Sequence, residues 1–146
     1  MADLHFEIEV TWQGTGKEAE GVVRTGGKEV QVSAPANMGG KGVGTSPEEL
    51  LLSGITSCYS GTLMGVLRKA GLPVDKVVVK TDGVVSGYPL SAKFDQLTVH
   101  PTIVGGDKEK LEAYIEQAKV ARDRCFVGKT VKGNMVYNVG EVTVEA

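Results

Sequence analysis

The feature that most constrains the fold is a long apolar segment between residues 46 and 69. Its start is typical of a helix, because Thr45 or Ser46 can cap the amino end, Pro47 suits the first turn, and two acids follow. Gly71-Leu72-Pro73 predicts its end. Its apolar side chains are Leu50, Leu51, Leu52, Ile55, Leu63, Met64, Val66 and Leu67. They span more than one stripe of the helix, so one small sheet face does not cover them and we expect a homodimer.

Alternating apolar residues predict strands before this helix. Residues 4–12 form the longest such run, which predicts a half-buried strand. The apolar face of this run consists of Leu4, Phe6, Ile8, Val10 and Trp12. Further strands at 22–23 and 29–32 are separated by Thr25-Gly26-Gly27, which is hairpin chemistry. An antiparallel meander is therefore expected at the amino end.

A second set of elements follows the long helix. Residues 77–85 and 94–104 predict another hairpin, with Leu97, Val99 and Ile103 on one face. Asp107 opens an amphipathic helix whose inner face we expect to be Leu111, Ile115, Ala118, Ala121 and Cys125. Residues 130–144 alternate and predict a returning strand. This order predicts an α+β fold, with antiparallel sheets packed around a long central helix that carries Cys58, in a single domain of residues 1–146.

Composition and charge exclude several classes of partner. The net charge is −2 and no block of lysine or arginine occurs, which argues against nucleic acid and against an anionic membrane surface. The amino end has no basic region followed by an apolar core, so no secretory signal is visible. Residues 50–67 are interrupted by serines and threonines and are expected to fall short of a membrane span. A cytoplasmic protein is expected.

The chain has two cysteines, one in each predicted helix. Cys58 lies deep in the apolar helix and Cys125 closes the amphipathic one. Each is open to a plainer interpretation, in which a small buried residue fills a gap in the core. In a reducing cytosol, however, a disulfide between them would be transient and catalytic rather than a permanent staple. Thiol chemistry is therefore the hypothesis that the sequence favours.

Two segments carry a resemblance to a known family. The run Gly44-Thr45-Ser46-Pro47-Glu48-Glu49-Leu50, followed by Ser57-Cys58-Tyr59, resembles the signature of the osmotically inducible protein C and organic hydroperoxide resistance (OsmC/Ohr) family. So does the approach to Cys125 through Ala118-Lys119-Val120-Ala121-Arg122-Asp123-Arg124. The resemblance extends over essentially the full chain. It implies an intertwined homodimer that reduces organic hydroperoxides without metal or flavin, so no cofactor is expected.

The resemblance also implies roles for individual residues. Cys58 matches the peroxidatic cysteine, which becomes a sulfenic acid, and Cys125 matches the resolving cysteine, which closes a Cys58–Cys125 disulfide. Glu48 matches the carboxylate that holds a nearby cationic side chain. Because ten residues of helix span about 15 Å, Glu48 must act through that cation or reach the site of the other subunit. The family's reductant is often a dihydrolipoyl group, which implies a lipoylated protein as a partner.

The sequence departs from the family pattern at the cation and after the second cysteine. Ungapped counting places Lys17 at the arginine of the organic hydroperoxide resistance branch, and Met38 near that of the osmotically inducible branch. Lysine supplies charge but not the planar, two-pronged donor of arginine. Arg24 is the reserve candidate, although it also fits an ordinary surface arginine at a strand end. Phe126 stands where the family commonly has proline.

Three other features of the sequence suggest alternative functions. The glycine-rich run 39–45 precedes a helix, but it matches neither phosphate-loop template, so a hinge or close-packing loop is favoured. A zinc site would have to combine the two cysteines with His5 and His100, without the close spacing that such sites use. A non-enzymatic alternative stays open, in which a dimeric stress protein binds apolar small molecules and both cysteines are merely buried.

Overall fold

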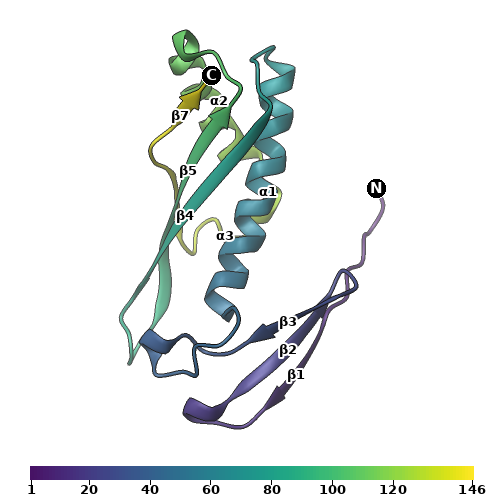
Figure 1. Ribbon diagram of the computed structural model, residues 1–146, viewed down its shortest axis with the longest axis vertical. Helices are drawn as coiled ribbons and strands as arrows, with labels where there is room; N and C mark the ends of the chain where they lie inside the picture. Colours follow the sequence, from purple (N-terminus) through teal and green to yellow (C-terminus); the bar gives the residue numbers. More distant parts are fainter. The chain divides into compact units, whose positions relative to one another are not determined.

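The computed structural model describes residues 1–146, which form two compact units, Met1–Leu51 and Leu52–Ala146. The elements are labelled in Figure 1. The strands are β1 (Glu9–Gln13), β2 (Glu20–Thr25), β3 (Lys28–Val32), β4 (Lys76–Ser86), β5 (Lys93–Val104), β6 (Val136–Val139) and β7 (Thr143–Glu145). The α-helices are α1 (Pro47–Lys69), α2 (Leu111–Arg124) and α3 (Phe126–Val131). Short 3-10 turns are η1 (Gly16–Glu18), η2 (Ala36–Met38) and η3 (Lys108–Lys110).

The first unit holds the expected antiparallel meander, in the order β1-β2-β3. The β2–β3 hairpin closes where Thr25 pairs with Lys28, so Gly26 and Gly27 form a two-residue loop. Both glycines have positive φ, 55° and 75°, a backbone conformation that other residues rarely adopt. The hairpin signal in the sequence is therefore confirmed.

The prediction of a half-buried strand over residues 4–12 is wrong in two respects. Regular strand structure begins only at Glu9, and the alternating apolar side chains are exposed, from 88% for Phe6 to 47% for Trp12. Alternating residues share one face only within a regular strand, so of the apolar set only Val10 and Trp12, which lie in β1, have a common face. Nothing in this chain covers them, so the pattern identifies a surface that is apolar but not buried here.

The glycine-rich loop before α1 is a packed turn. Its backbone N–H groups are used internally: Gly40 donates to the Pro35 carbonyl, Gly42 to that of Ala34, and Thr45 to that of Gln31. The buried Ser33 hydroxyl accepts from the Val43 N–H and donates to the Val43 carbonyl, at 2.9 Å in each case. These amides are already hydrogen-bonded, which supports the close-packing interpretation over a phosphate cradle.

Helix α1 begins and ends as its sequence indicates. Ser46 is the cap: its hydroxyl accepts from the Glu49 N–H at 3.1 Å and donates to the Glu49 carboxylate at 2.9 Å. At the other end Leu72 N–H bonds to the Leu67 carbonyl and Gly71 N–H to that of Arg68. This paired arrangement terminates the helix with Gly71 at positive φ.

The expectation that this apolar stretch falls short of a membrane span is wrong as to length. At 23 residues α1 is long and apolar enough to cross a membrane by length and composition alone, because its serines and threonines are spaced among many leucines. Core helices pass the same test. Ile55, Tyr59 and Leu63 are buried in the core of the second unit, so we assign α1 to that core.

The second unit packs α1 and α2 with a mixed sheet. β4 pairs antiparallel with β5, and these two long strands lie beside α1 in Figure 1. A hydrogen bond of 2.6 Å between the hydroxyls of Thr56 and Thr81 joins α1 to β4. The predicted inward face of β5 is confirmed, since Leu97, Val99 and Ile103 are fully buried.

The carboxyl-terminal segment differs from the single returning strand expected over residues 130–144. Thr130 and Val131 end α3, and the remainder forms two short strands, β6 and β7, both parallel to β5. Gly140 separates them; its N–H donates to the Val99 carbonyl at 2.8 Å. The chain thus follows β5 in two steps, and the break falls where the alternation of apolar residues stops.

The inner face of α2 is confirmed at Ala118, Ala121 and Cys125 and wrong at Leu111. Leu111 is 38% exposed, whereas Tyr114 is fully buried, and its hydroxyl donates to the Pro73 carbonyl at 2.6 Å. The buried positions 114, 118, 121 and 125 follow the helical spacing of three and four residues. The α+β class with a long helix carrying Cys58 is confirmed.

Candidate functional site

The site in the second unit is built around Cys58, in the middle of α1. The thiol is partly buried and packs against the hydrophobic core. Its backbone carbonyl accepts a hydrogen bond from the Thr62 hydroxyl at 2.8 Å, and Ser60 makes the equivalent bond to Thr56 at 2.7 Å. These bonds satisfy polar side chains within the apolar helix, so they do not compete for the sulfur.

Cys125 lies at the junction of α2 and α3 and is fully buried. Its N–H donates to the Ala121 carbonyl at 2.9 Å, as the last turn of α2. Its Sγ contacts the Ile55 carbonyl at 3.7 Å, which is one turn before Cys58 on α1. The end of α2 therefore brings the second thiol against the part of α1 that holds the first. No disulfide joins the two cysteines in this structure.

Several groups act on the Cys125 thiol in opposite directions. Burial raises the pKa of Cys125, and the nearby Cys58 raises it further through hydrogen bonding and charge. The Gly128 N–H and the Tyr137 hydroxyl act the other way, because each favours the thiolate. The net direction is upward, so the reduced site holds Cys125 as a neutral thiol. Cys125 Sγ lies against the Ile55 carbonyl, and both cysteines contact the same hydrophobic core, so the two residues lie in the same part of the second unit.

Two tyrosines complete the site, and the sequence pattern assigns a role to neither. Tyr59 follows Cys58 on α1, and its hydroxyl donates to the Ala118 carbonyl at 3.0 Å, which ties α1 to α2. Tyr137 on β6 meets the Tyr59 ring edge-on, with ring centres 6.4 Å apart. Burial raises the pKa of both phenols. The alternation over residues 131–139 could have indicated that Tyr137 faces inward, but not what it meets.

The Tyr137 hydroxyl is unusual in its hydrogen bonding. It is buried and has no hydrogen-bond partner. Burial is the main cause that raises the pKa of Tyr137, and the nearby Cys125 thiol is the second. A buried hydroxyl without a partner costs about 1–3 kcal/mol. A phenol next to a sulfur atom can donate to that sulfur when it is a thiolate.

Glu48 lies in the first turn of α1, within the first unit. One oxygen of its carboxylate, Oε1, is buried without a hydrogen-bond partner in this chain. A buried polar oxygen of this kind is costly unless a hydrogen-bond donor or a cation reaches it. Its neighbour Glu49 has a different task, since it completes the helix cap with Ser46.

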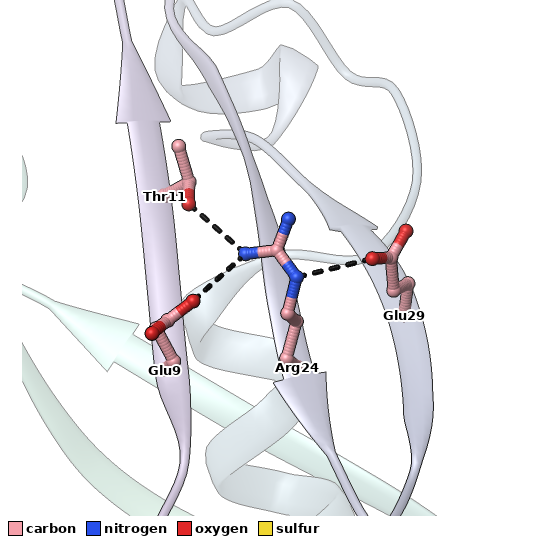
Figure 2. A network of polar contacts seen from close by, with 4 residues as sticks. All are labelled: Glu9, Thr11, Arg24 and Glu29. Atoms are coloured by element: carbon pink, nitrogen blue, oxygen red, sulfur yellow. Dashed lines mark hydrogen bonds and ion pairs between the residues drawn. The ribbon is translucent and has the colours of Figure 1, made fainter.

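The two candidate cations also lie in the first unit. Lys17 is exposed in η1 and makes no ion pair or hydrogen bond through its side chain. Arg24 on β2 is already engaged, as Figure 2 shows: it bonds to Glu9, Thr11 and Glu29, each at 3.0 Å. Arg24 therefore stabilises the exposed face of the meander by linking three strands. Its engagement favours the interpretation as a surface arginine.

The two positions at which the sequence departs from the family pattern also have defined places. Met38 ends the 3-10 turn η2 in the glycine-rich loop. Phe126 opens α3 and is 70% exposed, so it does not cap the core. The helix that follows Cys125 thus begins without proline, and the structure closes the turn through the Lys129 N–H, which donates to the Cys125 carbonyl at 2.9 Å.

Comparison with known proteins identifies relatives of this chain. Residues 39–139 match the model of a family described as OsmC-like protein. The uncharacterised protein YmaD of Bacillus subtilis is 25% identical over 138 residues, which cover 92% of this chain and 91% of that protein. An uncharacterised protein of Acinetobacter baylyi is 30% identical over 110 residues, 73% of each chain.

Solved structures share the fold at lower identity. The crystal structure of an OsmC-like protein from Mycoplasma pneumoniae has a TM-score of 0.78 and 18% identity, covering 99% of this chain and 100% of that one. The organic hydroperoxide resistance protein OhrB of Bacillus subtilis has a TM-score of 0.68 and 20% identity, covering 94% and 98%. The matched span of the family model covers most of the chain, including both cysteines, and this chain belongs to the OsmC-like protein family.

Proposed function

We propose that this protein is a thiol-dependent peroxidase that reduces organic hydroperoxides to alcohols, with Cys58 as the nucleophile and Cys125 as the resolving cysteine. The observation that supports the proposal is the packing of Cys125 against α1 one turn before Cys58, with Sγ 3.7 Å from the Ile55 carbonyl, although the two cysteines are 67 residues apart in the sequence. The likeness to proteins named for organic hydroperoxide resistance supports the choice of substrate class.

The chemistry proceeds in two steps. The Cys58 thiolate attacks the distal oxygen of the peroxide, the O–O bond breaks, and the alcohol leaves after it takes up a proton, so Cys58 becomes a sulfenic acid. Cys125 then attacks the Cys58 sulfur, which forms the disulfide and releases water. A thiol reductant must reopen that disulfide. The buried Cys125 suits the second step, because burial keeps it away from peroxide until Cys58 is oxidised.

Peroxide cleavage requires a thiolate, and an ordinary cysteine with a pKa of about 8.5 is mostly protonated at neutral pH. We propose that Lys17 supplies the activating charge and that Glu48 holds this cation in place. The unpartnered buried oxygen of Glu48 supports this role, since it calls for a cation. Both residues lie in the first unit, whereas Cys58 lies in the second. The proposal therefore includes a homodimer in which both subunits contribute residues to the site.

The test is peroxide turnover with purified protein and a dithiol reductant. Wild type should consume cumene hydroperoxide faster than hydrogen peroxide, and Cys58→Ser should consume neither above background. Cys125→Ser should retain a single oxidation event, which intact mass would detect as the gain of one oxygen or more on Cys58. Circular dichroism of each variant checks that the fold is kept.

Full activity of Cys58→Ser would overturn the assignment of the nucleophile. A wild-type protein that loses no thiol when cumene hydroperoxide is added would instead favour the non-enzymatic alternative. In that alternative the dimeric protein binds apolar small molecules. It should then bind an apolar fluorescent probe and show no peroxide turnover.

A further inference from the structure

A pocket of about 460 Å³ opens beside α3 in the second unit, and the proposed reaction does not use it. We call it the α3 pocket. Pockets of this size are typical of small-molecule sites. Neither cysteine lines it, and Cys125 is fully buried. A ligand of this pocket is therefore not a reactant of the thiol chemistry.

The charged side chains of the α3 pocket favour an anion. They are Arg122, Asp123, Lys129 and Lys132. The Arg122 side chain is only 27% exposed, and its Nε bonds to the Asp123 carboxylate at 3.1 Å. The two Nη groups of Arg122 make no hydrogen bond, and neither lysine forms an ion pair. Three cations against one paired carboxylate leave an uncompensated positive charge, and a concave surface of one charge concentrates ligands of the other.

Backbone hydrogen bonds hold the segment that carries the two lysines. The Lys132 N–H donates to the Lys129 carbonyl at 3.2 Å, and the Met135 N–H donates to the Val131 carbonyl at 3.2 Å. An isolated β-bridge also joins Lys132 to Met135. The chain therefore folds back on itself after α3. This turn fixes the backbone of three lining residues before any ligand binds, which lowers the entropy cost of binding.

The uncharged lining of the α3 pocket suits an apolar group. Met135 and Tyr137 supply its apolar side chains. The Tyr137 hydroxyl is buried, so a ligand meets the ring of this residue rather than its oxygen. Gly128 completes the lining, and a methyl group in place of its hydrogen would lie 2.3 Å from the Tyr137 ring, so no larger residue fits there. The thioether of methionine packs well against flat aromatic groups.

We propose that the α3 pocket binds a small organic anion that has a carboxylate group and a flat apolar body. Lys129, Lys132 and the free Nη groups of Arg122 bind the carboxylate. A carboxylate suits the guanidinium, because both groups are planar and can form two parallel hydrogen bonds. Met135 and the Tyr137 ring pack against the apolar body. The proposal goes beyond the proposed function, since binding involves neither cysteine.

The test compares three probes: benzoate, benzamide and inorganic phosphate. Benzoate has both parts of the proposed ligand, benzamide has the ring without the charge, and phosphate has the charge without the ring. The full-length protein is labelled with ¹³C at the methionine methyl groups, and the NMR signal that Met135→Leu removes is that of Met135. The shift of this signal during each titration gives the Kd for the α3 pocket, in the absence of peroxide.

At low ionic strength benzoate should bind about tenfold more tightly than benzamide or phosphate, and added salt should weaken the binding of benzoate but not of benzamide. Lys129→Met with Lys132→Met should weaken benzoate binding about tenfold, whereas Lys129→Arg with Lys132→Arg should keep it. Lys108→Met with Lys110→Met is the matched control, because it removes two exposed charges about 20 Å of helix away from Arg122. That variant should bind benzoate as wild type does.

Equal binding of benzoate and benzamide would overturn the proposal, and so would a Met135 signal that benzoate does not shift. Phosphate that binds as tightly as benzoate would show a site for bare anions, which also overturns it. Unchanged benzoate binding after Lys129→Met with Lys132→Met would place the anion elsewhere. If that variant does not fold, the comparison of the three probes and the effect of salt on wild type still decide the outcome.

Discussion

The two compact units differ in how much of their apolar surface the chain itself covers. In the second unit Ile55, Leu63 and Leu97 are fully buried, and the core extends over two helices and a sheet. In the first unit the large apolar side chains before and within β1 are exposed, with Leu4 at 77% and Phe6 at 88%. The second unit therefore meets the requirements of a core by itself, whereas the first presents a surface that calls for a partner.

The candidate site divides along the same boundary. The two cysteines and the two tyrosines lie in the second unit, where Cys125 packs against α1 one turn before Cys58 and the two tyrosine rings meet. Glu48, Lys17 and Arg24 lie in the first unit. Of these, Arg24 is committed to a surface network, while Glu48 has an unpartnered oxygen. The proposed redox pair therefore lies within one unit, whereas the residues proposed to activate it lie in the other.

The largest effect is expected from charged substitutions among the exposed apolar side chains of the first unit. If a second copy covers these side chains, Phe6→Asp with Ile8→Asp places two carboxylates in an apolar interface, at a cost of several kcal/mol. The homodimer should then weaken by about a thousandfold or more. Sedimentation at micromolar concentration would show a monomer with a normal circular dichroism spectrum, because residues 6 and 8 precede the first strand.

Glu7→Gln is the matched control, since it changes a neighbouring side chain without placing charge on the apolar face. It should leave the dimer intact. A wild-type protein that is already monomeric and well folded at that concentration would contradict the homodimer and would leave the exposed face unexplained.

Much of this architecture follows from local signals, and the exceptions have physical causes. The Ser46 cap, the Gly26-Gly27 hairpin and the buried face of β5 each depend on a few neighbouring residues, so the sequence predicts them. Burial of residues 4–12 depends on a surface outside the chain. The contact of Tyr137 with the site depends on the parallel pairing of Leu97 with Tyr137, which joins residues 40 apart.

The same distinction applies to the candidate site. Cys58 and Cys125 could be selected because each lies on a recognisable helix, and their proximity then needs only the packing of α1 against α2. The α3 helix was missed because its six residues are too few for a helical period to emerge from the neighbouring alternation. The cationic lining around it, from Lys129 to Lys132, was missed for the same reason.

The second prediction tests whether the first unit activates the second through Glu48. Glu48→Gln keeps the shape but removes the charge that would hold a cation. If that cation activates Cys58, peroxide reduction should slow by about tenfold to a hundredfold, which corresponds to roughly 1.4–2.7 kcal/mol. Stopped-flow consumption of cumene hydroperoxide measures it.

Glu49→Gln is the control for this experiment, because Glu49 shares the first turn of α1 and its amide can still accept from Ser46. Its rate should stay near that of wild type. An increase in the stability of Glu48→Gln with an unchanged rate would show that the carboxylate is buried without a partner in the active protein too.

A smaller effect is expected at Lys17. If this lysine supplies the positive charge near Cys58, Lys17→Met should slow alkylation of Cys58 by iodoacetamide at pH 7 by about threefold to tenfold, because fewer molecules hold the thiolate. Lys17→Arg should preserve the rate or raise it. Arg24→Met should leave it unchanged, since that arginine is engaged with Glu9 and Glu29. The reverse pattern would assign the role to Arg24.

The smallest effect lies within the second unit alone and concerns stability against pH. Because burial raises the pKa of Cys125, the folded protein keeps this proton at a pH where an unfolded cysteine, with a pKa of about 8.5, releases it. The folded state then binds more protons than the unfolded state, so the free energy of unfolding falls as the pH rises above about 8.5. One proton gives a slope of at most about 1.4 kcal/mol per pH unit. Urea unfolding of the reduced protein between pH 7 and 9.5 should show this fall, and Cys125→Ala should flatten it, whereas Cys58→Ala should keep its sign. A stability that rises with pH in wild type would contradict the raised pKa of the buried Cys125 thiol.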